Sequence, residues 1–510
     1  MIAYQIERLL AFGRCHGIVK AEDIIPSRNA LLDLFRLSEP YSEPVEYEAE
    51  TATEVLEQML DYAAETGLIS EDTITQRDGF SARIMGLLMP RQSEVVEAFY
   101  ARYQSAPEAA TDWFYALSRA SNYIQVDRVR KNAYWTEETG WGTLEISINL
   151  SKPEKDPRDI VAAKHAPAAK YPKCLLCKEN AGFAGTHTHP ARQNHRIIPI
   201  TLNEEAWYLQ YSPYVYYNEH CIVFDAIHRP MKLTEATFRR LLDFVGQFPH
   251  YFVGSNADLP IVGGSILSHD HFQGGRYTFP MAQAKPYERY THSQFPGVQA
   301  AVVKWPMSVV RIAGADKETL LRLAMHLFDG WKRYTDPAAE VFAHTDDTPH
   351  NTVTPIARVN AEGLFELDIV LRNNRTSDAH PLGIFHPHAH LHHIKKENIG
   401  LIEVMGLAVL PARLQGELDA IEDLLCSKKP FDPALYGDGE HPLHKHIDWI
   451  GYLADKYGTD NQKSAAKQLV EKETAEVFAQ VLTDAGVFKW DDSGKGHFAD
   501  FMGALGFERS

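Results

Sequence analysis

The sequence predicts an α+β protein, in which a mainly antiparallel sheet with flanking helices lies between two helical regions. Apolar residues recur at helical spacing over 55–60 and 84–88, and again over 469–481. Between these regions, Leu144–Leu150 alternates apolar and polar residues as a half-buried strand does. We therefore expect a helical region over 1–120, a sheet-bearing middle over 121–410 and a second helical region over 411–510.

The middle region contains two expected helices, and each follows a strand-like apolar run. The first follows Cys221–Phe224 and begins after Thr234, which can cap it; its apolar positions lie on one face. The second helix covers about 316–334 and follows the run over 308–312. This recurrence indicates a weak internal duplication, with halves over 121–300 and 301–410.

Composition excludes several classes of protein. The 510 residues are 45% hydrophobic and 23% charged, which is ordinary for a soluble globular protein. A net charge of −17 argues against binding nucleic acid, and no apolar run approaches the roughly 20 residues that span a membrane. The N-terminus lacks the pattern of a signal peptide, and five cysteines are too few for a disulfide framework. We expect a cytoplasmic protein.

The segment Gly263–Gly275 places His269, His271 and Gln273 two residues apart, between pairs of glycines. On an extended backbone such residues share one side of the strand. The glycines let main-chain N–H groups approach an anion. An imidazole beside such an anion cradle favours phosphoryl or nucleotidyl transfer, but a core strand that ends in a glycine turn fits the pattern equally well.

A second motif, Cys174-Leu175-Leu176-Cys177, has the spacing of a tetrahedral zinc site. Zinc would then need two further ligands, for which histidines are the candidates. A redox dithiol and two cysteines packed as small apolar side chains are the alternatives. His228 lies between an expected strand and an expected helix, where loops often carry function.

Three further groups of polar residues have both a functional and a structural interpretation. The run His386–His393 could bind a metal, stack or face water, and it leads into Lys395 and Lys396, which could hold a phosphate. Arg372–Arg375 ends a strand and suits sugar-phosphate recognition or a solvated strand end. Asn203-Glu204 could hold a base and a ribose, but capping a turn is the favoured interpretation.

Taken together, these motifs resemble the galactose-1-phosphate uridylyltransferase family of the histidine-triad superfamily, in its second bacterial branch. The resemblance is carried by His269–Gln273, the cysteine pair, His228, Tyr216–Cys221 and Ile394–Leu410, and it extends over nearly the whole chain. It implies a duplicated histidine-triad-like antiparallel sheet with flanking helices.

The resemblance also implies roles for individual residues. His271 would be the nucleophile, Gln273 and Ser265 would assist it, and zinc would be structural. The expected zinc ligands are Cys174, Cys177, His228 and His269. The expected substrate-binding residues are Asn203, Glu204, Asn256, Gly264, Arg276, Lys395, Lys396 and Glu403. Among them, one of the two lysines would bind the sugar phosphate, Glu403 the hexose hydroxyls, and Asn203 with Glu204 the uridine.

By the same resemblance, UMP would pass from UDP-glucose to galactose 1-phosphate, or to a related hexose 1-phosphate, through a covalent uridylyl-histidine with ping-pong kinetics. A homodimer is expected, without nucleic acid or membrane partners. The alternatives are a nucleotidyl hydrolase, a dinucleoside-polyphosphate phosphorylase and a non-catalytic zinc protein. Two departures stand out: the first branch has proline where this chain has Asp270, and Leu367–Val370 lacks the His-x-His of that branch's second metal site.

Overall fold

The computed structural model describes the chain from residue 1 to residue 510 except for residues 152–170, 187 and 265. It contains two compact units, each assembled from separate segments of the chain. Unit 1 consists of residues 1–131, 151–231 and 268–276, and unit 2 consists of residues 132–150, 232–267 and 277–510. The expected division at residues 120, 300 and 410 stays a prediction.

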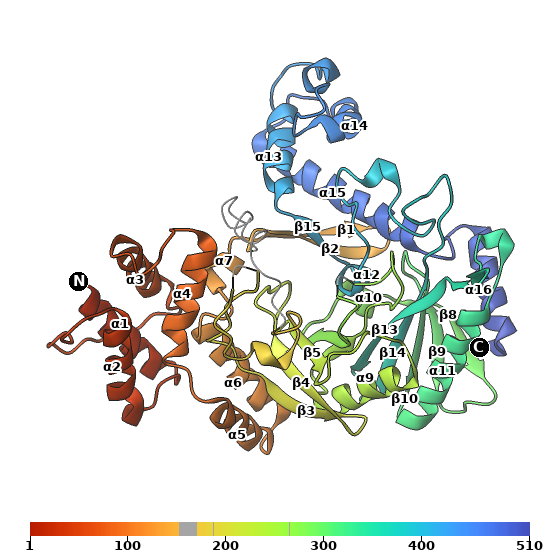
Figure 1. Ribbon diagram of the computed structural model, residues 1–510. Coiled ribbons are helices and arrows are strands. Elements are labelled where there is room, and N and C mark those ends of the chain that lie inside the picture. Colours follow the sequence, from red (N-terminus) through yellow and green to blue (C-terminus); the bar gives the residue numbers. More distant parts are fainter. Residues whose placement is uncertain (152–170, 187, 265) are drawn as a thin grey trace. The chain divides into compact units, whose positions relative to one another are not determined.

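Unit 1 begins with the expected helical region, drawn from red to orange in Figure 1. Its apolar faces are buried: Val55, Leu56, Met59 and Leu60 of α3 are each less than 5% exposed. Pro107 begins α6, where a missing N–H costs nothing. The helices are α1 (Ile2–Cys15), α2 (Ile24–Leu34), α3 (Thr53–Glu65), α4 (Ile74–Gly86), α5 (Gln92–Tyr103), α6 (Pro107–Ala120) and the short α7 (Val126–Val129).

Four antiparallel strands of unit 1 lie in the order β7-β5-β4-β3. They are β3 (Ile198–Leu202), β4 (Glu205–Tyr211), β5 (Cys221–Asp225) and β7 (His271–Gly275). The ring of Trp207 on β4 stacks on that of Phe272 on β7, with centroids 4.9 Å apart. This buried pair holds the strand that carries His271 and Gln273.

Unit 2 contains seven further antiparallel strands in the order β16-β8-β9-β10-β14-β13-β6. They are β6 (Phe252–Gly254), β8 (Pro286–His292), β9 (Gln299–Val303), β10 (Val309–Gly314), β13 (Asn351–Val359), β14 (Phe365–Asn373) and β16 (Phe507–Arg509). Helices α9 (Glu235–Gln247) and α11 (Lys317–Arg333) pack against this sheet and against each other. Thr234 caps α9 as expected, and the Asp316 side chain accepts a hydrogen bond from the Thr319 N–H at the start of α11.

A smaller sheet of unit 2 joins β1 (Ala133–Thr139), β2 (Gly142–Asn149) and β15 (Leu407–Pro411), with β15 parallel to β2. The long helix α15 (Lys463–Ala485) packs on β1 and β2 (Figure 1). The other helices of unit 2 are α10 (Pro280–Gln283), α12 (Leu401–Val404), α13 (Arg413–Leu425), α14 (Ile447–Tyr457) and α16 (Asp492–Ala504). Within the described residues, no helix combines the length and the apolar composition that a membrane span requires.

The strand connections repeat, which confirms the expected duplication. In the first half, the meander β3-β4-β5 is followed by α9, and β7 returns to pair with β5. In the second repeat, which begins with β8 and so before residue 301, the meander β8-β9-β10 is followed by α11, and β14 returns to pair with β10. The α+β prediction is correct, and the short strand β16 is an addition that the helical pattern of the last hundred residues did not predict.

Candidate functional site

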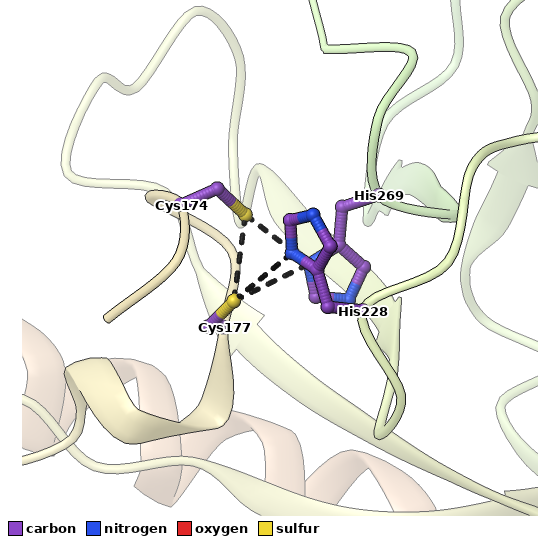
Figure 2. Close-up of side chains that lie close together, drawn as sticks. All are labelled: Cys174, Cys177, His228 and His269. Carbon is purple, nitrogen blue, oxygen red and sulfur yellow. Dashed lines mark hydrogen bonds between the residues drawn. The ribbon is translucent and has the colours of Figure 1, made fainter. Parts of the chain in front are cut away.

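Unit 1 gathers the four predicted metal ligands into one cluster (Figure 2). One ligand atom from each of Cys174, Cys177, His228 and His269 lies within 4.8 Å of the others. The sulfurs are 3.6 Å apart, and Nδ1 of His269 lies 3.2 Å from the Cys174 sulfur. Nδ1 of His228 lies 3.3 Å from the Cys177 sulfur.

These separations fit a tetrahedral zinc ion. With metal–ligand distances of 2.0–2.3 Å, neighbouring ligand atoms lie roughly 3.3–3.8 Å apart. Two thiols and two imidazoles are also an established donor set for structural zinc. The separation of 3.6 Å between the sulfurs is far beyond the disulfide length of about 2.05 Å, so the two cysteines are not joined to each other and both sulfurs can face a metal.

Backbone and amide contacts orient the ligands. The side-chain nitrogen of Asn180 donates to the carbonyls of Cys174 and Cys177, at 2.9 and 2.7 Å, and so fixes the turn that carries both sulfurs. Nε2 of His269 lies 2.9 Å from the carbonyl oxygen of Asp225, which can only accept a hydrogen bond. The proton is therefore on Nε2, and Nδ1 faces the sulfurs with a free lone pair.

His271 is the first residue of β7, opposite Phe224 on β5, and it is 6% exposed. Its Nδ1 lies 2.8 Å from the carbonyl oxygen of His269. Nδ1 therefore carries the proton, and Nε2 keeps its lone pair. Burial lowers the pKa of His271 to about 4. The strand begins at His271, and His269 lies in a bend before it. His269 therefore does not share a strand face with His271 and Gln273.

Gln273, two residues further along β7, faces a residue to which the sequence interpretation gave no role. Its side-chain oxygen lies 3.2 Å from Nε2 of His220, and Nδ1 of His220 lies 2.8 Å from the carbonyl oxygen of Tyr214. His220 is 2% exposed and comes just before β5. Its place in Tyr216–Cys221, one of the segments that carry the resemblance, was the signal that could have found it.

Unit 2 gathers four of the residues predicted to bind substrate. Lys395 and Glu403 form a short ion pair, and both side chains are less than 10% exposed. The Asn256 side-chain oxygen accepts a hydrogen bond from the N–H of Leu401, at 2.9 Å. A Cβ atom at Gly264 would lie 2.5 Å from the Asn256 side-chain nitrogen, so a larger residue there would displace the Asn256 side chain.

The burial of the basic residues near this cluster could not be predicted from the sequence alone. Lys396 is exposed, whereas its neighbour Lys395 is buried. Arg372 is 2% exposed and donates to the carbonyl of Ile399 and to the Thr354 hydroxyl, at 3.0 and 3.3 Å. Burial lowers the pKa of Arg372 to about 10. The interpretation of Arg372 as a solvated strand end is therefore wrong.

Three of the remaining predicted residues have structural partners of their own, and a fourth cannot be placed. Asn203 and Glu204 have φ angles of +49° and +60° and form the two-residue turn between β3 and β4, which agrees with the turn interpretation. Arg276 pairs with Asp112 at 2.5 Å and lies 3.2 Å from a Glu219 oxygen. Ser265 lies outside the described residues.

Comparison with known proteins identifies the family. The family described as "Galactose-1-phosphate uridyl transferase, N-terminal domain" matches residues 19–230, and the family of the corresponding C-terminal domain matches residues 244–447. A solved structure of yeast Ap4A phosphorylase Apa2 has a TM-score of 0.31 and 11% identity, over 70% of this chain and 92% of that one.

Curated relatives match over nearly the full length. A galactose-1-phosphate uridylyltransferase of Caldanaerobacter subterraneus subsp. tengcongensis is 56% identical, over 99% of this chain and 98% of the relative. Proteins of the same name from Halalkalibacterium halodurans and Bacillus subtilis are 52% and 50% identical, with at least 98% of each chain covered. The chain therefore belongs to the galactose-1-phosphate uridylyltransferase family of enzymes.

Proposed function

We propose that the protein transfers UMP from UDP-glucose to galactose 1-phosphate through a covalent bond to His271. The observation that carries this proposal is the hydrogen bond from Nδ1–H of His271 to the His269 carbonyl, which leaves Nε2 as an unprotonated nucleophile. The names of the full-length relatives supply the substrate class.

In the first step, Nε2 of His271 attacks the α-phosphorus of UDP-glucose. A nitrogen–phosphorus bond forms, and the bond from that phosphorus to the oxygen shared with the β-phosphate breaks. The electron pair leaves with glucose 1-phosphate, whose phosphate needs no proton to depart. The Nδ1–H bond to the His269 carbonyl stabilises the positive charge that develops on the ring.

In the second step, a phosphate oxygen of galactose 1-phosphate attacks the same phosphorus, and the lone pair returns to Nε2. Lys395 and Glu403 are our candidates for binding the sugar phosphate and the hexose hydroxyls. An ammonium group suits the phosphate as a point charge, and a carboxylate accepts hydrogen bonds from hydroxyls. Gln273 would donate to the phosphoryl oxygens, Asn203 and Glu204 stay candidates for uridine contacts, and Arg276 stays a candidate for substrate binding.

We further propose that Cys174, Cys177, His228 and His269 hold zinc, in agreement with their separations. The ion would supply a structural cross-link next to the strand of His271. We infer a cytoplasmic location, because a reducing compartment keeps such thiols available for a metal.

The test uses UDP-glucose labelled in its uridine. We expect the wild-type protein to retain acid-labile label after denaturation, and His271→Ala to retain none. His390→Ala is the matched control, because His390 is an exposed histidine in the His386–His393 cluster. Full labelling of His271→Ala, or no label on the wild type, would contradict the proposal. Release of UMP and glucose 1-phosphate from UDP-glucose when no acceptor hexose 1-phosphate has been added would favour the hydrolase.

The acceptor is tested by competition. Galactose 1-phosphate should discharge the labelled enzyme faster than N-acetylgalactosamine 1-phosphate when both are present at equal concentration. A reversed preference would assign the enzyme to the N-acetylated sugar.

A further inference from the structure

His220 has a hydrogen-bond contact on each ring nitrogen, and the partners are a backbone carbonyl and a side-chain amide. Nδ1 lies 2.8 Å from the carbonyl oxygen of Tyr214, and Nε2 lies 3.2 Å from the side-chain oxygen of Gln273. All three residues belong to unit 1, and His220 is 2% exposed.

The Tyr214 carbonyl decides the tautomer of His220. A carbonyl oxygen can only accept a hydrogen bond and cannot exchange with a donor, so the proton belongs on Nδ1. Burial lowers the pKa of His220 to about 4, so the ring carries a single proton at neutral pH. Nε2 of His220 is therefore an acceptor.

The side-chain amide of Gln273 must then present an N–H to His220, because two facing acceptors repel. Rotation of the amide by half a turn places its nitrogen against Nε2 of His220 without moving other atoms. One N–H of Gln273 is then used by His220, and its second N–H is available to a ligand.

We infer that His220 is a positioning residue that keeps Gln273 turned with its N–H, and not its carbonyl oxygen, toward the phosphoryl group of the nucleotide. The inference rests on the proposed function. In the opposite orientation, the Gln273 oxygen would repel the anionic phosphoryl oxygens that the reaction must stabilise. The resulting chain of hydrogen bonds runs from Gln273 through His220 to the Tyr214 carbonyl, and each bond polarises the next.

Neighbouring rings hold His220 in place. The ring centroids of Tyr216 and Tyr217 lie 5.3 and 4.6 Å from that of His220. The Tyr217 hydroxyl donates to the carbonyl of Gly274, directly after Gln273, at 3.1 Å. Tyr217 thus provides a matched control, since it is buried beside His220 and its hydroxyl is bonded to the backbone of the same strand.

The test measures the single-turnover rate at which uridine-labelled UDP-glucose modifies the enzyme. We expect His220→Phe, which keeps a ring and removes both nitrogens, to slow this step about 10- to 100-fold. This is no more than the roughly 100- to 1,000-fold loss that follows removal of one oxyanion donor, because Gln273 itself remains. Tyr217→Phe should stay within about threefold of the wild type. His220→Gln, whose amide oxygen can accept from Gln273, should recover part of the loss.

A double substitution separates positioning from a general structural role. If His220 acts through Gln273, His220→Phe should have little further effect in a Gln273→Ala background. Independent, multiplying effects would overturn the inference, as would equal losses in His220→Phe and Tyr217→Phe.

The wild-type protein offers a test that needs no variant. Its ¹⁵N-histidine NMR spectrum, with the His220 signal assigned by its loss in His220→Gln, should show the Nδ1-protonated neutral ring at pH 7. An Nε2-protonated ring would overturn the inference while the labelling of His271 stood. Absence of labelling in the wild type would instead overturn the proposed function, whatever the tautomer of His220.

Discussion

The three histidines around β7 show how a backbone carbonyl determines the chemistry of an imidazole ring. His269 is held through Nε2 by the Asp225 carbonyl, which leaves Nδ1 to face the cysteine sulfurs. His271 and His220 are held through Nδ1, by the carbonyls of His269 and Tyr214, which leaves Nε2 free to react or accept. The same residue type thus supplies the proposed metal ligand, the proposed nucleophile and an acceptor.

At the scale of single residues, we predict that Cys174→Ser loses the bound metal. A serine hydroxyl is a poor zinc ligand, and three remaining ligands would bind the ion more weakly. The wild type should contain about one zinc per chain by elemental mass spectrometry after dialysis, and the variant much less than one. The melting temperature of the variant should fall as well.

The control for this prediction is Cys426→Ser, because Cys426 is a free cysteine outside the ligand cluster. It should keep both the zinc and the melting temperature of the wild type. Equal zinc content in Cys174→Ser and the wild type would remove the proposed site.

At the scale of elements, the segment from Lys395 to Glu403 is held by partners from other parts of unit 2. Arg372 on β14 bonds the Ile399 carbonyl, and Asn256 bonds the Leu401 N–H at the start of α12. Glu403 closes the same turn by accepting from the Gly400 N–H at 3.0 Å. The Lys395–Glu403 pair is therefore fixed by backbone contacts that sequence spacing does not reveal.

This arrangement predicts different results for two adjacent lysines. Lys395→Met keeps the length of the side chain and removes the buried charge, so the KM for galactose 1-phosphate should rise about tenfold or more. Lys396→Met removes a charge that is exposed and should leave the KM nearly unchanged. Steady-state kinetics with varied galactose 1-phosphate distinguishes the two.

A larger effect from Lys396→Met than from Lys395→Met would reverse our assignment. The melting temperature of each variant distinguishes a loss of substrate binding from a loss of stability. The distinction is needed because Lys395→Met also leaves the buried Glu403 carboxylate without its lysine partner.

At the scale of the whole molecule, buried neutral histidines make stability sensitive to acid. Burial lowers the pKa of His195 and of His393 to about 3 in each case. In the unfolded chain these groups titrate near 6.5. Between the two values the unfolded state binds more protons than the folded state, so acid favours unfolding.

We therefore predict that the free energy of unfolding is greatest above about pH 6.5 and declines as the pH falls toward 4. His195 should contribute at most about 1.4 kcal/mol per pH unit in this window. His195→Gln keeps a polar partner for Gln210, which His195 contacts at 2.9 Å, and should flatten the decline. Urea unfolding at pH 7, 6, 5 and 4.5 measures the free energy of unfolding of the wild type and of His195→Gln. An identical dependence of this free energy on pH in the two proteins would refute the prediction.

Local pattern predicted many of the elements correctly. The helix α9 follows from the spacing of its apolar residues and from the capping residue Thr234, and α11 lies within the expected range of about 316–334. The strand β2 was expected from alternation over Leu144–Leu150, but the expectation that it is half-buried is wrong, because residues 144–148 are all buried. These signals succeed because helix and strand periodicity depends on neighbours in the chain. The strand β16 lacks such a signal, because three residues are too few for periodicity and pairing with β8 is a long-range contact.

By itself, the sequence determined which side chains could do chemistry here: the two cysteines and two histidines of the metal cluster, and the histidine and glutamine of β7. Only the tertiary structure decided which nitrogen of each ring is free, that Lys395 and not Lys396 is buried, and that His220 contacts Gln273. The physical reason is that residue type sets the available donors and acceptors. Partners distant in the chain, most of them backbone carbonyls, set which of these a folded side chain can use.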